Sequence, residues 1–404
     1  MQKTQKFRIT AFSLVASLLS LTASVTPARA ADAVDNSVNA PQPNASILIV
    51  GEKLIGQQSS SICMQEVLQA LKAKPNDAKL LLLKAAIENY ECQYAKSIAD
   101  STAVLRANPN NERALVLRSE ARLRSALFDL ARQDMLDAGR LSSPENYKDN
   151  FSEIDTLEYD FQHQVKEKER KLALATTAVL FSQNEEGCES LAGAQLTNSV
   201  KNSQKRLLVR WWNVNNRTEL LDLLKYQLTT GHNRRWQNMQ KEYEANRPLD
   251  RFRSGWTDAH DYEVGVSLLK KYGKQFGTRG LLAWDHCRYI ALCRWGYQCG
   301  YLTEAEAWEL IMPVAARIQK QSKNWDQLAT DYLIGRHFWS DTIYQEGNDT
   351  VQKIKYRLLH DPGSTWVKIP LHSVKIAVPS DDAAIIASID RMLSAGSKVQ
   401  RSTQ

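Results

Sequence analysis

The residues most able to do chemistry lie in and around one stretch, Leu281–Glu309, which otherwise has the composition of a buried helix. On a helix, Asp285 and Arg288 share an apolar stripe and can form an ion pair at i and i+3. Four further residues from the same half of the chain complete the candidate cluster: Arg294, Arg336, His232 and Glu306. Carboxylates, an imidazole and guanidinium groups that converge on one point could transfer protons or bind an anionic ligand.

A structural role for the same residues is the competing interpretation. A buried Asp285–Arg288 pair can serve as a strut, and Glu306 is the fourth residue of a capping box that begins at Thr303. Structural ion pairs perturb ionisable groups as active sites do. The chain also has no glycine-rich phosphate loop and no Gly-x-Ser-x-Gly turn. We therefore assign no catalytic residue. We favour a structural role, in which these polar side chains act as struts between helices of the core, over a reaction site.

Three cysteines at a spacing of six residues, Cys287, Cys293 and Cys299, suggest a metal site, with His286 nearby. Six residues advance a helix by about 600°, so neighbouring thiols point to different faces. Zinc ligands usually come in close pairs two to four residues apart, which are missing here. We expect no metal and no cofactor; the alternatives are disulfide pairing, with Cys188 as a candidate partner, and buried free thiols.

Residues 1–30 have the three parts of a secretory signal peptide: a basic start, an apolar run and a small-residue end at Ala30. The apolar run contains Ser and Thr and has no stop-transfer flank, so we expect no transmembrane segment after signal removal. Formal net charge falls from +7 to +3 when its four cations, Lys3, Lys6, Arg8 and Arg29, are removed. A nearly balanced charge gives no reason to expect a nucleic-acid partner. The expected location is the periplasm of a Gram-negative bacterium, with secretion as the alternative.

An exported chain meets an oxidising compartment, where thiols tend to pair. Cys63 and Cys92 lie on either side of Pro75, on helices that should run antiparallel. Their offset of about 7.5 Å along a helix is longer than a bridge allows, but a tilt or a longer turn would correct it. The sequence therefore predicts a possible Cys63–Cys92 disulfide.

Residues 46–145, after a disordered lead-in at 31–45, carry a repeat. Pro75, Pro109 and Pro144 are spaced by 34 and 35 residues, a period typical of tetratricopeptide repeats. The segment resembles that family, with Ala85 and Ser119 at the same small-residue position of two repeats. The resemblance implies stacked helix pairs with a groove that binds a protein or peptide; a simple docking spacer is the alternative.

The rest of the chain is expected to be helical as well. Residues 146–170 predict a linker helix, 171–378 a helical domain that contains all ten Trp residues, and 379–404 a C-terminal helix and tail. Caps at Asn216, Asp258, Thr303 and Asn324 mark helix starts. One short extended piece is expected at Ser364–Pro370. The predicted fold is all-α: a short tetratricopeptide-like array followed by a Trp-rich helical domain.

The second half also resembles the bacterial domain-of-unknown-function 1266 family. The blocks that carry the resemblance are "RWWNVNNRTELLDLLKYQLTTGHNRRW", "LLAWDHCRYIALCRWGYQCGYLTEAEAWE", "SKNWDQLATDYLIGRHFW" and "TWVKIP", in this order, within about residues 171–376. No activity is established for the family, so the resemblance implies a domain of this type but does not imply what chemistry it performs. An export signal is a departure, because family members are commonly interpreted as not exported.

Three functions agree with these patterns. The leading hypothesis is an exported protein-binding or adaptor module whose repeat groove takes a protein or peptide partner. The alternative is an enzyme or a receptor for a small anionic ligand, with the Asp/Arg cluster lining a cleft. The third is an envelope structural protein in which the polar cluster is only a strut.

Overall fold

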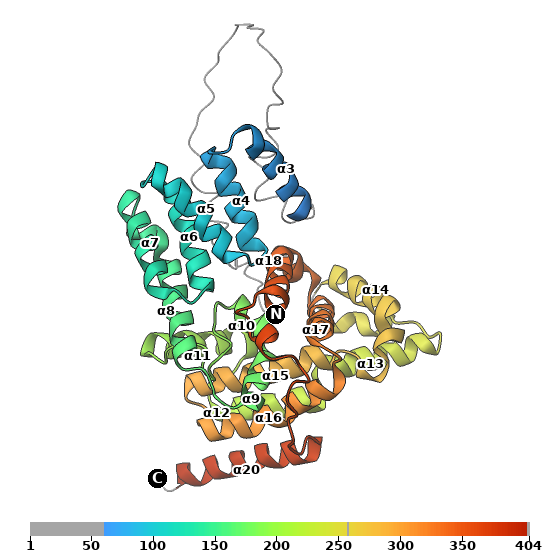
Figure 1. Ribbon diagram of the computed structural model, residues 1–404. Helices are drawn as coiled ribbons and strands as arrows, with labels where there is room; N and C mark the ends of the chain where they lie inside the picture. Colours follow the sequence, from blue (N-terminus) through green and yellow to red (C-terminus); the bar gives the residue numbers. More distant parts are fainter. Residues whose placement is uncertain (1–59, 257, 402–404) are drawn as a thin grey trace. The chain divides into compact units, whose positions relative to one another are not determined.

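The computed structural model describes residues 60–256 and 258–401, and every regular element in these ranges is a helix, as predicted (Figure 1). The predicted signal peptide (1–30) and lead-in (31–45) lie outside the described residues. The chain divides into two compact units between Asp155 and Thr156. No helix in the described part of the chain is both long enough and apolar enough to span a membrane.

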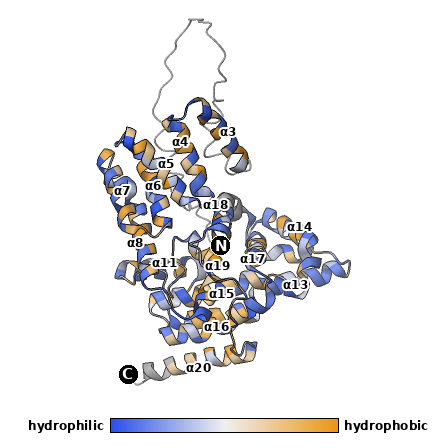
Figure 2. Cartoon of the chain, viewed as in Figure 1, coloured by the Kyte–Doolittle hydropathy of each residue, from blue (hydrophilic) through white to orange (hydrophobic). Residues whose placement is uncertain are grey.

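The first unit is an array of helices, each packed against the next in chain order (Figure 1). Its elements are α3 (Ser60–Ala73), α4 (Ala78–Tyr90), α5 (Tyr94–Ala107), α6 (Glu112–Arg124), α7 (Phe128–Leu141), the 3₁₀ turn η2 (Pro144–Tyr147) and the start of α8 (Lys148–Gln162). All of these helices carry both hydrophobic and hydrophilic residues, as amphipathic helices do (Figure 2). The predicted helix pairs are therefore present.

The two central hairpins, α4–α5 and α6–α7, repeat each other at a distance of 34 residues. Asp77 caps α4 and Asn111 caps α6, each with a side-chain oxygen that accepts a backbone N–H of the first turn. The turns also match, because Cys92 (φ 59°) and Ala126 (φ 58°) both adopt the left-handed conformation between the paired helices. The period inferred from proline spacing is thus present in the caps and turns.

The predicted Cys63–Cys92 disulfide is absent, and no disulfide joins any of the six cysteines. Cys63 packs in one apolar cluster with Val67 of α3 and with Leu83 and Ile87 of α4. Cys92 lies in another cluster, which contains Tyr94 and Ala121. The two thiols face different neighbours, because Cys92 belongs to the left-handed turn after α4 and is directed towards α6.

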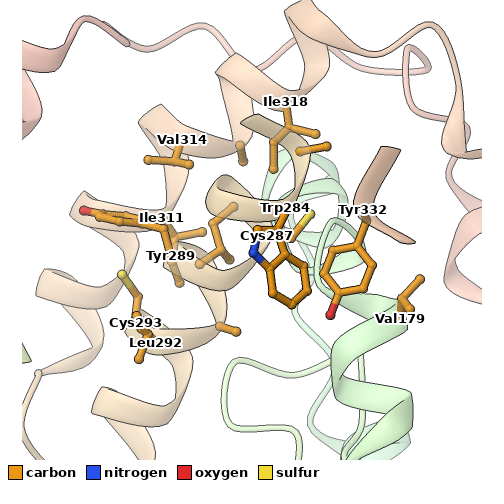
Figure 3. Packing of buried hydrophobic residues seen from close by; sticks show 14 of the residues in the cluster. Val179, Trp284, Cys287, Tyr289, Leu292, Cys293, Ile311, Val314, Ile318 and Tyr332 are labelled. Atoms are coloured by element: carbon orange, nitrogen blue, oxygen red, sulfur yellow. The ribbon is translucent and has the colours of Figure 1, made fainter. Parts of the chain in front are cut away.

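The second unit consists of helices around one apolar core. They are α9 (Lys168–Ala175), α10 (Ala178–Gln183), α11 (Asn198–Trp212), α12 (Arg217–Thr229), α13 (Gly231–Glu244), η3 (Asp250–Gly255), α14 (Ala259–Phe276), η4 (Gly277–Arg279), α15 (Leu282–Cys299), α16 (Glu304–Gln321), α17 (Trp325–Trp339), α18 (Asp341–His360), α19 (Thr365–Lys368) and α20 (Asp382–Arg401). Helix α15 is central, since it contacts α10, α11, α12, α13, α16 and α17. Tyr289 and Leu292 of α15 pack with Ile311 and Val314 of α16 (Figure 3).

Most predicted helix starts in this unit are confirmed. Asn216, Asp258, Thr303 and Asn324 each accept a first-turn backbone N–H with the side chain, and Thr303 forms the full capping box. The extended piece predicted at Ser364–Pro370 is wrong: Thr365–Lys368 forms the short helix α19, because the Ser364 hydroxyl accepts the N–H of Val367 and starts a turn.

Candidate functional site

Helix α15 buries polar as well as apolar residues. Asp285, His286, Arg288, Arg294 and Gln298 are all buried, together with the surrounding apolar side chains. A buried polar group costs free energy unless it is hydrogen-bonded. Each of these groups therefore needs a hydrogen-bond partner. The identity of that partner shows whether the group has a structural role.

Asp285 is a helix cap that acts from a neighbouring helix. Its two carboxylate oxygens accept the backbone N–H groups of His232 (3.1 Å) and Asn233 (2.8 Å), in the first turn of α13. The residue before α13, Thr230, provides no side-chain cap. Asn233 in turn accepts the N–H of Leu281 (2.8 Å) at the start of α15. The carboxylate thus satisfies donors that an ordinary N-cap would satisfy, and lies where the helix dipole favours a negative charge.

Arg288 does not pair with Asp285 as predicted; the two share no hydrogen bond or ion pair. Its Nη1 donates instead to Nδ1 of His232 at 3.1 Å. Its guanidinium carbon lies 4.2 Å from the ring centre of Trp212, 4.6 Å from that of Trp284 and 5.7 Å from that of Trp339. Burial lowers the pKa of Arg288 to about 10, which leaves the group charged at neutral pH.

Arg336 lies on α17, the helix that supplies two of the neighbouring aromatic residues. It is one helical turn from Tyr332 and three residues from Trp339 on α17, and both rings pack on Trp284 with centroids 5.0 and 5.8 Å away. Figure 3 shows Trp284 and Tyr332 next to each other. Burial raises the pKa of Tyr332, and the charges of Arg336 and Arg288 both oppose that rise, so the hydroxyl lies within electrostatic reach of both. We call Arg288, His232, Arg336, Trp212, Trp284 and Trp339 the Arg288 cluster.

Arg294 is a strut and lies apart from the Arg288 cluster. It is fully buried, and its guanidinium carbon lies 3.4 Å from the ring centre of Phe181. It donates four hydrogen bonds of 2.7–3.1 Å to Thr177 Oγ1 and to the carbonyl oxygens of Gly187, Ser190 and Leu191. Burial lowers its pKa, and Cys188, Asp160 and Glu186 oppose that shift. The side chain fixes the irregular segment between α10 and α11 onto the core.

Glu306 is also committed to structure. It completes the capping box with Thr303, and its carboxylate accepts two hydrogen bonds from Arg217, at 2.7 and 3.0 Å. Burial raises its pKa, but Arg217 and Thr303 outweigh burial and hold the pKa below the ordinary value. The structure thus brings Asp285, His232 and Arg288 together, places Arg336 on the neighbouring helix α17 with its charge acting on the Tyr332 hydroxyl, and puts Arg294 and Glu306 in separate contacts.

Residues 207–371 match the family model described as a protein of unknown function (DUF1266). This match includes the whole Arg288 cluster. No curated protein matches the chain, and no solved structure does. The family description assigns no activity, so the chemistry of the Arg288 cluster must be inferred from its own geometry.

Sequence reasoning missed several buried charges. Asp160 accepts the N–H of Glu189 and both the N–H and hydroxyl of Ser190, and Glu186 accepts the indole N–H of Trp295. Burial raises the pKa of both carboxyl groups. The partners of both residues are far away in the sequence, so the helical spacing of residues could not have identified these contacts.

A second missed group involves two histidines on one carboxylate. The oxygens of Asp341 lie 3.0 Å from Nδ1 of His337 and 3.1 Å from Nε2 of His260. Asp341 is the first residue of α18, and its backbone N–H donates to Asp261. Among the described residues, no set of three or more His, Cys, Asp and Glu side chains is arranged to hold a metal ion.

Proposed function

We propose that this protein is an exported adaptor whose N-terminal array, of the tetratricopeptide type, binds an acidic segment of a partner protein. The observation that carries the proposal is the repetition of hairpins, caps and left-handed turns at 34 residues. Stacked helix pairs of this period form an extended groove lined by the first helix of each pair. In this array those helices are α4 and α6, which contact each other directly.

The faces of α4 and α6 can be assigned from their ion pairs. Lys84 binds Asp100 of α5, and Arg122 binds Asp134 of α7, so these sides of the helices face their hairpin partners. Glu88 also pairs with Lys84, so it marks the same side of α4. Lys79 lies nine residues before Glu88, and this spacing places Lys79 on the opposite side of the helix. Arg113 has the same relation to Arg122. Both first-turn residues are exposed and project from the side opposite the hairpin partner, where we propose that the groove lies.

The charge of that side indicates the partner. Lys79 and Arg113 occupy the same position of two successive repeats, 34 residues apart, on the helices that would line the groove. Two regularly spaced cations select a segment with acidic side chains and raise its association rate. An extended acidic segment is therefore the occupant we expect.

The location is part of the proposal. The N-terminal pattern described above supports export with cleavage after Ala30. Intact-mass measurement of the protein recovered from the periplasmic fraction tests this directly. A mature chain that begins at Ala31 supports export, whereas full-length protein in the cytoplasm contradicts it.

The binding proposal is tested by photo-crosslinking in the producing cells. A photoreactive amino acid replaces Ala86, which is partly exposed and on the same face of α4 as Lys79. We expect one discrete protein adduct, whose yield falls several-fold in the K79E/R113E variant. Lys270→Glu is the matched control, because Lys270 is an exposed cation of α14 in the other unit.

Two results would contradict the proposal. One is the absence of any adduct at position 86, which would leave the array as a spacer. The other is an adduct whose yield is the same in K79E/R113E and in Lys270→Glu, because binding would then not depend on the two groove cations.

A further inference from the structure

Arg288 and Arg294 lie on the same buried helix but differ in how they are satisfied. An arginine has five N–H donors and no acceptor. Arg294 donates to four protein acceptors, whereas the hydrogen bond to His232 is the only one that Arg288 makes to a described residue. The carboxylate of Asp285, whose charge acts on Arg288, is occupied by the N-terminus of α13. The edge of the Arg288 guanidinium is therefore not committed to a protein acceptor.

Two further donors in the same cluster are buried without a partner. These are the indole N–H of Trp284, whose side chain is 97% buried, and Nη1 of Arg336. Buried donors in folded proteins are almost always paired, so each unpaired one requires an explanation. The ring of Trp284 contacts the Arg288 guanidinium, and Arg336 belongs to α17, which supplies Trp339 to the same guanidinium. These two buried donors and the uncommitted edge of Arg288 indicate a place for an acceptor.

The charge and surroundings of the cluster limit which acceptor fits. Arg288 and Arg336 carry two positive charges, Asp285 carries one negative charge, and His232 is a hydrogen-bond acceptor and hence neutral. One added negative charge would balance the cluster. The rings of Trp212 and Trp339 are partly exposed, so a molecule that reaches Arg288 from this side meets flat apolar surfaces.

We propose that the Arg288 cluster binds a small organic carboxylate that carries a flat apolar group. The carboxylate accepts hydrogen bonds from the free edge of Arg288 and from Arg336, and the apolar group packs against Trp212 and Trp339. A planar guanidinium edge matches the two oxygens of a carboxylate, and a single negative charge balances the site without excess. This site is independent of the adaptor proposal, because it belongs to the other unit.

The experiment uses the full mature chain with benzoate as the probe. Isothermal titration is combined with tryptophan fluorescence, because benzoate binding should change the emission of the three indoles of the cluster. We expect saturable benzoate binding that weakens by about tenfold or more in Arg288→Lys, since lysine keeps the charge but loses the planar edge. Arg279→Lys is the matched control, because Arg279 lies near Phe276 but its Nε already donates to Asp331. It should leave benzoate binding unchanged.

A second variant keeps the test decisive if Arg288→Lys folds poorly. Arg336→Gln removes a cation with a buried unpartnered donor, so we expect weaker benzoate binding with no loss of thermal stability in the ligand-free protein. Absence of saturable benzoate binding would overturn the proposal, as would binding that neither variant weakens. Saturable binding of inorganic phosphate in place of benzoate would overturn the carboxylate assignment.

Discussion

Arg288 and His232 share a hydrogen bond in which Arg288 Nη1 is the donor and His232 Nδ1, 3.1 Å away, is the acceptor. An arginine can only donate, so Nδ1 carries no proton and the imidazole is neutral. The 3.5 Å separation between His232 Nδ1 and Asp285 Oδ1 is therefore not a charged ion pair. Burial lowers the pKa of His232, which agrees with a neutral ring beside a cation.

The first prediction concerns acid stability. Because the pKa of His232 is lower in the folded than in the unfolded state, the unfolded chain binds more protons below about pH 6.5. Stability should therefore fall as the pH decreases through this range. Urea unfolding followed by tryptophan fluorescence should show a smaller loss in His232→Gln, whose side-chain oxygen can accept from Arg288 without titrating. An unchanged pH dependence in His232→Gln would contradict this assignment.

The second prediction tests the cap formed by Asp285. Gly231 has φ +44°, and a Cβ at this position would lie 2.3 Å from Asp285 Oδ2. Gly300 also has a positive φ (+76°), but nothing lies within 4 Å of its Cβ position. Gly300→Ala should cost about 1 kcal/mol, and Gly231→Ala about 1–3 kcal/mol more, because the clash displaces the carboxylate from two backbone donors.

A double-mutant cycle provides the control for this difference. In an Asp285→Ala background the clash is gone, so Gly231→Ala should cost no more than Gly300→Ala. Equal costs of the two glycine substitutions in the parent protein would show that Asp285 is not held against Gly231.

The third prediction uses a buried charge that differs between the two repeats. Glu88 occupies the position of Arg122, so Lys84 is shared by Glu88 and Asp100, whereas Asp134 has both Arg118 and Arg122. Burial, followed by the nearby Asp100, raises the pKa of Glu88 to about 7. The folded array then binds more protons than the unfolded chain between about pH 4.5 and 7, so it loses stability as the pH rises.

Glu88→Gln should remove this dependence and stabilise the array above pH 7 by roughly 1–3 kcal/mol. Arg122→Glu should introduce the same dependence into the second hairpin. Hydrogen exchange of α4 to α7 at pH 5 and pH 8 is the measurement, because all Trp residues lie in the other unit and fluorescence does not report on the array. Equal protection of Glu88→Gln and the parent protein at both pH values would refute the role of Glu88.

Local chemistry in the sequence was enough to predict most helix starts, since a cap and its acceptor lie within three residues. Asn216, Thr303 and Asn324 illustrate this. The partners of Asp285 could not be predicted in this way. They lie 52 and 53 residues earlier in the chain, and helix periodicity suggested Arg288 instead because it is the nearest charge on the same face.

The aromatic residues around Arg288 show the same limit. The first block of the family resemblance contains two adjacent tryptophans: the side chain of Trp211 is exposed, whereas Trp212 packs on Arg288. Which of two adjacent tryptophans faces the core depends on the packing of α11 on α15. Composition predicted an aromatic-rich core, whereas the selection of particular rings required the fold.

The two buried arginines of α15 have different roles: Arg294 is a strut, and Arg288 is an uncommitted cation. The most direct test compares Arg294→Met with Arg288→Met, the same substitution six residues apart, by urea unfolding with tryptophan fluorescence. Arg294→Met should cost about 3–5 kcal/mol, because four acceptors and two nearby carboxylates lose their cation. Arg288→Met should cost about 1 kcal/mol or less, because methionine fits among indoles and no carboxylate loses a hydrogen bond. Equal losses in the two variants would show that Arg288 is a second strut and not an uncommitted cation.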